Sequence, residues 1–235
     1  MAGRLTRAGR WPARILVGST LLVGCASAGP RQAASDCVPQ AALDAYVQNS
    51  IERKADVYAS LSPEPGQTIF LGSSLIEEGP WRELFGDDVL NRGISAETTH
   101  DLLARVEAVA ADRPARLFLY TGGNNLSRGG ETPEQAAAGV AQVVSALSEA
   151  LPETIIHLST LLPREARHAD KVAAVNAALV RLAETRTLPL IDAHAAFSDP
   201  DGALRADFTN DGIHLNGEGY RLWATIIEQG LEETR

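Results

Sequence analysis

Short apolar runs and longer periodic stretches alternate along the chain from residue 67 to its end. Runs rich in β-branched residues are typical of strands buried in a parallel sheet, and apolar residues that recur every three or four positions are typical of helices. The alternation predicts strands near residues 68–72, 89–92, 117–121, 155–160 and 189–192, and helices over residues 75–85, 98–111, 133–151, 169–186 and 216–232. We therefore expect an α/β fold with a five-stranded parallel sheet covered by helices.

One further helix is expected before the sheet, over residues 39–61. Pro39 suits the first turn of a helix, and the apolar residues after it recur at steps of three and four. They are Leu43, Tyr46, Val47, Ile51, Ala55, Tyr58 and Leu61. This spacing predicts an amphipathic helix that packs on the domain.

The first 24 residues have the pattern of a signal peptide. A short apolar run, residues 15–24, ends at Cys25 and follows four arginines, which are Arg4, Arg7, Arg10 and Arg14. This run has about half of the ~20 residues needed to cross a bilayer, and no later segment is long and uncharged enough to do so. The N-terminal segment is therefore expected to direct export and not to be part of the fold.

The end of this segment, Leu22-Val23-Gly24-Cys25, resembles the bacterial lipobox, in which the cysteine is lipidated and becomes the first residue of the mature protein. The resemblance implies a lipoprotein of the bacterial cell envelope, anchored through Cys25 at the outer membrane or the periplasmic face. The alternative is cleavage after Ala26 or Ala28, which would leave a soluble exported protein. Residues 25–38, rich in Ala, Ser, Gly and Pro, are expected to form a flexible tether, and residues 39–235 a single domain.

The chain is acidic, with a formal net charge of −9 that becomes −13 once residues 1–24 and their four arginines are removed. An acidic surface repels phosphate backbones and anionic headgroups, so nucleic acid is not an expected partner and membrane association would depend on the lipid. Cys37 is the only other cysteine, which excludes an intramolecular disulfide if Cys25 is lipidated. A Cys25–Cys37 bridge could form if it is not.

Three chemically different groups lie at the ends of predicted elements. In DGIHLNGEGY, residues 211–220, Asp211 and His214 stand three residues apart, just before the last helix. In FLGSSLIEEGPW, residues 70–81, the first strand runs into two serines at a strand-to-helix turn, where a histidine could reach one of them. The third strand leads, in LYTGGNNL at residues 119–126, to two glycines and Asn124. Because ligands bind at the carboxyl ends of parallel strands, we expect these groups on one edge of the sheet.

With these blocks in this order, residues 69–235 resemble the SGNH (GDSL-type) hydrolases, in the branch of the bacterial esterases and platelet-activating-factor acetylhydrolases. The resemblance places the nucleophile of the first block at Ser74. It makes Asn124, in Gly-Gly-Asn-Asn, the amide that helps to hold the oxyanion. In the last block, Asp-x-x-His, it makes His214 the base and Asp211 its orienting partner. It also implies a flavodoxin-like three-layer sandwich, the fold of these hydrolases.

The second block, NRGISAETT at residues 91–99, departs from the family pattern. Ala96 stands where the family usually has a glycine whose backbone N–H faces the oxyanion. Alanine can also donate this N–H, and we expect a negative φ at Ala96, because a left-handed φ would cost about 1 to 2 kcal/mol. Asn125 replaces the usual Asp and is expected to alter hydrogen bonding in its loop more than the chemistry.

These roles predict a serine ester hydrolase of the carboxylesterase, acetylesterase or lysophospholipase type. His214 would take the proton of Ser74, and the oxyanion would be held by the N–H groups of Ser74 and Ala96 and by the amide of Asn124. Water then cleaves the acyl-enzyme, so no cofactor is expected. No metal site is expected either, since His157, His168 and His194 show no ligand spacing.

The expected substrate is a small-molecule, glycan or lipid ester, and short loops without an evident lid favour a short acyl chain such as acetyl. One alternative is a non-catalytic envelope lipoprotein that binds a glycan or lipid on the same fold, with Ala96 as the mark of a degraded oxyanion hole. The complete Ser, Asn, Asp and His set argues against it. A phosphatase or nucleotidase would need a metal cluster or phosphate loop that the sequence lacks.

Overall fold

The computed structural model describes residues 38–233. The expected signal peptide, Cys25 and the expected tether up to residue 37 lie outside these residues. None of the helices in the described part of the chain is long and apolar enough to span a membrane. Residues 45–235 form a compact unit that contains the whole sheet.

Five parallel strands form one sheet in the order β2-β1-β3-β4-β5. They are β1 (Thr68–Gly72), β2 (Val89–Gly93), β3 (Arg116–Tyr120), β4 (Ile155–Ser159) and β5 (Leu190–Ile191). The chain runs from β1 to one edge and then back past β1 to build the other half, which is the flavodoxin-like order with its switch point between β1 and β3. The expected fold class and the five expected strands are confirmed.

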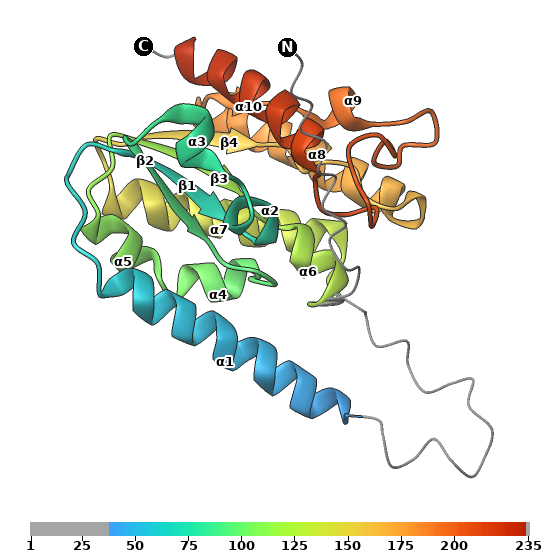
Figure 1. The fold of residues 1–235 in the computed structure, drawn as a ribbon, viewed down its shortest axis with the longest axis horizontal. Helices are drawn as coiled ribbons and strands as arrows, with labels where there is room; N and C mark the ends of the chain where they lie inside the picture. Colours follow the sequence, from blue (N-terminus) through green and yellow to red (C-terminus); the bar gives the residue numbers. More distant parts are fainter. Residues whose placement is uncertain (1–37, 234–235) are drawn as a thin grey trace, which may run out of the picture. The chain divides into compact units, whose positions relative to one another are not determined.

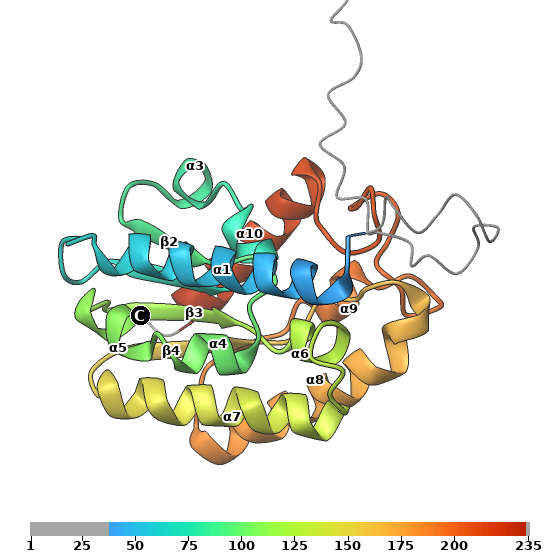
Figure 2. The ribbon, with the colours of Figure 1, turned by 90° about the horizontal axis from the view of Figure 1, so that it is seen from below.

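Helices cover both faces of the sheet, and Figure 2 shows α7 and α8 on one side of it and α3 and α10 on the other. The helices are α1 (Gln40–Ala59), α2 (Ser74–Glu77), α3 (Trp81–Phe85), α4 (Thr99–Leu103), α5 (Val106–Ala111), α6 (Gly123–Ser127), α7 (Pro133–Ala150), α8 (Ala169–Arg186), α9 (His194–Phe197) and α10 (Gly217–Glu232), with a 3₁₀ turn over Ala166–His168.

Two of the expected helices are each divided in the structure. The helix expected over residues 75–85 ends at Glu77 and a second begins at Trp81, because Gly79 and Pro80 lie between them and proline has no N–H to donate. The helix expected over residues 98–111 is interrupted at Ala104 and Arg105. The divisions leave α2 as a single short turn directly after β1.

An aromatic cluster joins the centre of the sheet to α3 and α10. Phe70 of β1 stacks on Trp81 with ring centroids 4.6 Å apart, and Phe118 of β3 meets Trp223 of α10 edge-on at 5.8 Å. Trp81 and Trp223 in turn contact each other at 5.5 Å, and both are buried. Aromatic pairs in these geometries stabilise a core beyond the area they bury. The cluster fixes α3 and α10 against the strand that leads to Ser74.

The part of α1 within the compact unit, from Ala45, is only partly amphipathic. Ile51 is buried, but Tyr46 is 68% exposed, so the expected apolar face is not all packed. Polar contacts also attach α1 to the domain. Tyr58 donates a hydrogen bond to the carbonyl of Gly93 at 3.0 Å, and Lys54 pairs with Glu77 at 3.1 Å. These contacts join α1 to the end of β2 and to α2.

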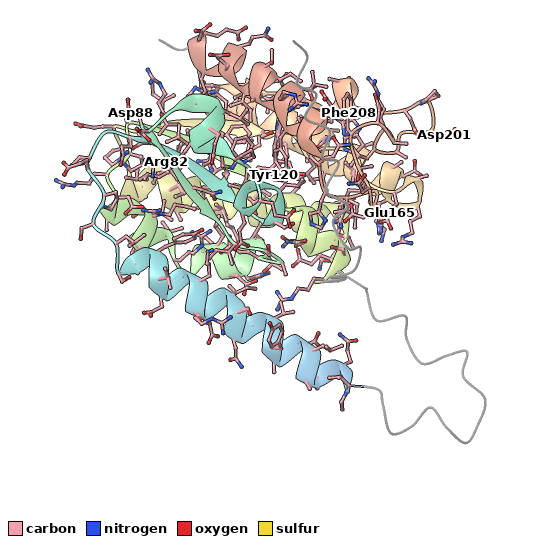
Figure 3. All side chains as sticks on the ribbon, in the orientation of Figure 1. Arg82, Asp88, Tyr120, Glu165, Asp201 and Phe208 are labelled. Atoms are coloured by element: carbon pink, nitrogen blue, oxygen red, sulfur yellow. The ribbon has the colours of Figure 1, made fainter. Side chains whose placement is uncertain are left out.

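The carboxyl ends of the strands lie together at one edge of the sheet, where α2 follows β1 and α6 follows β3 (Figure 1). Tyr120, the last residue of β3, and Glu165, in the loop after β4, lie toward this edge (Figure 3). Close backbone contact is required there: a Cβ at Gly93 would come within 2.1 Å of the backbone nitrogen of Glu77. Gly93 therefore allows β2 to lie directly against α2.

Candidate active site

Ser74 is the first residue of α2, at the turn that follows β1. Side chains from three other elements hold this turn through its carbonyl oxygens. The indole Nε1 of Trp81 and the amide Nδ2 of Asn91 donate to the carbonyl of Ile76 at 2.7 and 2.8 Å, and the Tyr220 hydroxyl donates to the carbonyl of Leu75 at 3.0 Å. Trp81 thus contacts the helix that carries Ser74.

Ser74, His214 and Asp211 form a continuous hydrogen-bonded chain, although 137 residues separate Ser74 from Asp211 in the sequence. The Nε2 of His214 lies 3.0 Å from the Oγ of Ser74, and its Nδ1 lies 2.7 Å from an oxygen of Asp211. The loop between Thr209 and Leu215, which are bridged as an antiparallel pair, carries both residues to the carboxyl edge of β1. The arrangement lets the imidazole accept a proton from the hydroxyl while the carboxylate holds the other ring nitrogen.

Hydrogen bonds to the carboxylate of Asp211 fix its charge. Its burial raises the pKa of this group, but hydrogen bonds from the ring and backbone of His214 and from the backbone of Ile213 outweigh it and bring the pKa of Asp211 down to about 2. The two backbone N–H groups donate at 2.8 and 2.9 Å to the oxygen that the ring does not contact. Asp211 is therefore ionised across the ordinary pH range.

The loop after β2 carries Ala96 in a left-handed conformation, with φ of 64°. The expectation of a negative φ at this position is wrong. The physical reason lies in the tight turn at Ser95 and Ala96 between β2 and α4, in which the N–H of Glu97 donates back to the carbonyl of Ile94 at 3.3 Å. Alanine in this region is strained by about 1 to 2 kcal/mol relative to its usual conformations. The position accordingly suits the glycine that the family pattern has there.

Two charged pairs hold this strained loop. On one side, the N–H of Ser95 donates at 2.6 Å to Glu77, which is also paired with Lys54 of α1. On the other side, the buried carboxylate of Glu97 receives two hydrogen bonds from Arg105, at 2.5 and 2.7 Å. Burial raises the pKa of the Glu97 carboxyl to about 7, against the opposing effect of Arg105. No sequence motif indicates either pair.

Asn124 lies in α6 and faces the same loop. Its Nδ2 donates to the carbonyl of Glu97 at 2.9 Å, which fixes the amide beside the Ala96 turn and leaves its second N–H available. Asn125 is fully buried and its side chain bonds Thr99 and Glu131, at distances between 2.7 and 3.0 Å. These bonds join α6 to the start of α4 and to Glu131.

A small cavity adjoins Ser74, with a volume of about 20 Å³. Its lining includes Ser74, Tyr120, Asn124, Arg164 and Ile213. A cavity of this size holds about one water molecule, or a group of similar size such as a methyl. Sequence reasoning did not identify Tyr120 or Arg164 as site residues. Tyr120 ends the apolar run of β3 and Arg164 follows the apolar run of β4, and both lie at the edge where ligands bind.

The expected site residues are thus placed as follows. Ser74, Asp211 and His214 are joined by hydrogen bonds, and Asn124 of α6 bonds the carbonyl of Glu97, the residue after Ala96. Cys25 lies outside the described residues. Within residues 38–233, no three His, Cys, Asp or Glu side chains are grouped so that they could hold a metal ion.

Comparison with known sequences identifies one family. The profile of the GDSL-like Lipase/Acylhydrolase family matches residues 63–222. Human platelet-activating factor acetylhydrolase IB subunit alpha2 is 31% identical over 181 residues, which cover 71% of this chain and 78% of the human one. The match includes Ser74, Ala96, Asn124, Asp211 and His214 within the family profile's bounds.

Solved structures of hydrolases share the fold. A GDSL-like lipase from Bacteroides thetaiotaomicron superposes with a TM-score of 0.70 at 23% identity, covering 79% of this chain and 98% of the lipase. The acetyl xylan esterase AlAXEase superposes with a TM-score of 0.59 at 20% identity, covering 69% of this chain and 98% of the esterase. At these identities the structures show a common fold.

Proposed function

Because the chain belongs to the GDSL-like lipase/acylhydrolase family and is an ester-bond hydrolase, we propose that it cleaves its substrate with Ser74 as nucleophile, His214 as general base and Asp211 as the partner of His214. One observation carries the proposal: the unbroken chain of hydrogen bonds from the Ser74 hydroxyl through the imidazole to the Asp211 carboxylate. A serine hydroxyl is a weak nucleophile by itself and needs a base within hydrogen-bond reach.

The reaction follows from these contacts in two halves. The Oγ of Ser74 attacks the ester carbonyl while Nε2 of His214 takes the hydroxyl proton, and the imidazolium that forms is stabilised by the Asp211 carboxylate. The tetrahedral intermediate collapses, the ester C–O bond breaks, and His214 returns the proton to the leaving alcohol. Water then attacks the acyl-enzyme by the same route, which releases the acid and restores Ser74.

The oxyanion is proposed to lie between α2, the Ala96 turn and α6. Its donors would be the backbone N–H groups of Ser74 and Ala96 and the side-chain amide of Asn124. The bond from Asn124 to the carbonyl of Glu97 supports this assignment, because it positions the amide before any substrate binds. Loss of one such donor typically lowers kcat by about 100- to 1,000-fold.

An acetyl ester is the substrate class we favour within the family. The cavity beside Ser74 is small, at about 20 Å³, and this supports a short acyl group such as acetyl. The names of a relative, platelet-activating factor acetylhydrolase, and of a structural neighbour, acetyl xylan esterase, are in keeping with acetyl transfer to water.

Hydrolysis of p-nitrophenyl acetate, butyrate and octanoate by the full chain tests the proposal. We expect the order acetate, butyrate, octanoate in kcat/KM, and a loss of at least about 10⁴-fold in kcat for Ser74→Ala, because the nucleophile is absent. Ser145→Ala on α7 is a matched control, since its hydroxyl bonds the helix carbonyl of Ala141 and the Arg186 side chain and no residue of the proposed site. That variant should keep full activity.

Two outcomes would contradict the proposal. Turnover that persists in Ser74→Ala would mean that another group carries out the chemistry. An absence of turnover on every ester, with folding verified by circular dichroism, would favour the alternative of a binding protein. A preference for octanoate would keep the serine mechanism but refute the assignment of an acetyl substrate.

A further inference from the structure

Arg164 places a cation at the cavity beside Ser74. It lies in the loop between β4 and the 3₁₀ turn, and it lines the cavity together with Asn124 and Ile213. A neutral acetyl ester has no group that would require a guanidinium at this position. The presence of Arg164 therefore calls for a separate explanation.

The guanidinium is held by uncharged groups. Its Nη1 donates to the carbonyl of Gly123 at 3.1 Å and contacts the Ser127 hydroxyl at 3.2 Å, both in α6. The backbone of Arg164 is also fixed, since its carbonyl accepts a hydrogen bond from the N–H of Leu204 at 2.9 Å. One terminal nitrogen of the Arg164 guanidinium, Nη1, is thus anchored. This orients the other N–H donors of the guanidinium, and its positive charge is not neutralised.

No carboxylate within residues 38–233 pairs with Arg164. Glu165, its neighbour in the chain, contacts Arg167 at 2.8 Å, and the carboxylate of Asp211 is bound to His214. The Nε of Arg164 is buried and has no hydrogen-bond partner within the described residues. By contrast, the buried Arg105 donates through Nε and Nη2 to the two carboxylate oxygens of Glu97.

An unpaired, half-buried cation is costly in a protein unless another charge compensates it. Arginine also has a planar fork that matches carboxylate and phosphate groups. A chain whose net charge is −9 has many carboxylates available for pairing, yet none in the described part is placed on Arg164. A ligand with a negative group would supply the missing partner.

The position of the cavity decides which half of the ester carries this group. Ile213, which precedes His214, is also part of the lining, and His214 is the group that returns a proton to the leaving alcohol in the proposed reaction. Arg164 therefore lies where the alcohol would leave.

We infer that Arg164 is a specificity-determining residue that binds an anionic group, a carboxylate or a phosphate, on the alcohol part of the ester. The inference rests on the proposed use of Ser74 as nucleophile. It narrows the substrate class from acetyl esters in general to acetyl esters of acidic alcohols, such as hydroxy acids or phosphorylated polyols.

Three aryl acetates of similar shape test the inference: 3-acetoxybenzoate, 3-acetoxyphenyl phosphate and the neutral methyl 3-acetoxybenzoate. Each is assayed with the full chain and with Arg164→Gln, Arg164→Lys and Arg167→Gln. The change in kcat/KM between wild type and variant is compared across the esters, so that differences in their intrinsic reactivity cancel. Arg167→Gln is the matched control, because Arg167 is exposed and pairs with Glu165 outside the cavity.

For Arg164→Gln we expect the loss in kcat/KM on an anionic ester to exceed the loss on the neutral ester by about 10- to 100-fold, the usual effect of one charged hydrogen bond. Arg164→Lys should recover part of this difference, since it keeps the charge without the fork. Arg167→Gln should show none. The anionic ester that shows the larger loss in kcat/KM, the carboxylate or the phosphate, carries the anion that the site prefers.

Equal losses on all three esters would overturn the inference, because they would show a purely structural role for Arg164. If wild type hydrolyses no ester, the proposed function fails, and the inference is then tested by binding of 3-hydroxybenzoate in calorimetry. Binding that is lost in Arg164→Gln supports it, and binding that is unchanged or absent overturns it. If Arg164→Gln does not fold, stronger inhibition of wild type by 3-hydroxybenzoate than by 3-hydroxybenzamide supports the inference, and equal inhibition overturns it.

Discussion

Ala96 combines a role proposed in catalysis with an unfavourable backbone conformation. Its φ of 64° is in the region that glycine adopts without strain. We expect Ala96→Gly to raise the free energy of unfolding by up to about 1.6 kcal/mol. Relief of the left-handed strain contributes about 1 to 2 kcal/mol, and the greater freedom of glycine in the unfolded chain offsets about 0.4 to 1 kcal/mol of this gain. Urea unfolding measures the change.

The same substitution elsewhere has the opposite sign and provides the control. Ala138 is exposed in the middle of α7, where a change to glycine should lower the free energy of unfolding by about 1 kcal/mol. Since glycine keeps the backbone N–H, Ala96→Gly should also retain esterase activity. A fall in stability at Ala96 equal to that at Ala138 would show that the left-handed strain is absent in solution.

Asp211 allows a prediction about pH. Its folded pKa of about 2 lies below the ordinary value of about 3.9, so its contribution to stability is present above pH 4 and is lost as the pH falls from about 4 toward 2. The difference in melting midpoint between wild type and Asp211→Asn should therefore shrink over this interval and be constant above pH 5. The effect is expected to be small, because the side chain is nearly half exposed. A difference that grows on acidification would contradict it.

Some features of single residues could be predicted from the sequence and others could not. Ser74, Asn124, Asp211 and His214 stand in short blocks at predicted strand ends, and chain order was enough to place them on one edge. The conformation of Ala96 could not be derived, because it depends on a turn held by Glu77 of α2 and by Arg105, which lies between α4 and α5. Arg164 carried no motif, and only its unpaired charge in three dimensions sets it apart from other arginines.

Among the elements, α4 and α5 hold the Ala96 loop through Arg105, which lies at the interruption between them. Arg105→Met would leave the Glu97 carboxyl buried without its cation, and removing one partner of a buried pair typically costs about 3 to 5 kcal/mol. We expect this loss in urea unfolding at pH 8, together with a lower kcat, because Asn124 is bound to the carbonyl of Glu97.

The pH dependence of this variant separates charge from packing. Glu97 already has a pKa raised to about 7, so an acid that loses its cation will be neutral at pH 5 and the destabilisation should diminish there. Arg82→Met is the control, since its pair with Asp87 is exposed and should contribute less than about 1 kcal/mol at either pH. A loss in Arg105→Met that is equal at pH 5 and pH 8 would indicate lost packing instead.

The element pattern itself was largely predictable. Alternation of apolar runs identified all five strands because both faces of a parallel sheet are buried. The breaks at residues 78–80 and 104–105 were not foreseen, since helical periodicity continues across them in the sequence. The amphipathic pattern of α1 was overestimated: Lys54 and Tyr58 attach it by polar contacts, while Tyr46 is exposed.

In the whole molecule, the family match supports the catalytic unit but not the export segment. The family profile begins at residue 63, so the match says nothing about residues 1–37, which also lie outside the described structure. We propose from the sequence that the protein is anchored to the bacterial envelope by a lipid on Cys25. The acidic character of the chain supports a lipid over a basic patch as the means of attachment, because negative charge opposes binding to anionic headgroups.

The two cysteines of the chain make this proposal testable in one experiment. With a palmitate analogue supplied to a bacterial host, wild type should incorporate the label and fractionate with membranes, whereas Cys25→Ser should do neither, because the acylated thiol is absent. Cys37→Ser is the matched control and should behave as wild type, since it removes the other thiol and leaves Leu22-Val23-Gly24-Cys25 intact. Labelling that survives in Cys25→Ser would refute lipidation at this residue. An unlabelled, soluble wild type would instead support cleavage after Ala26 or Ala28 and an enzyme that acts free of the membrane.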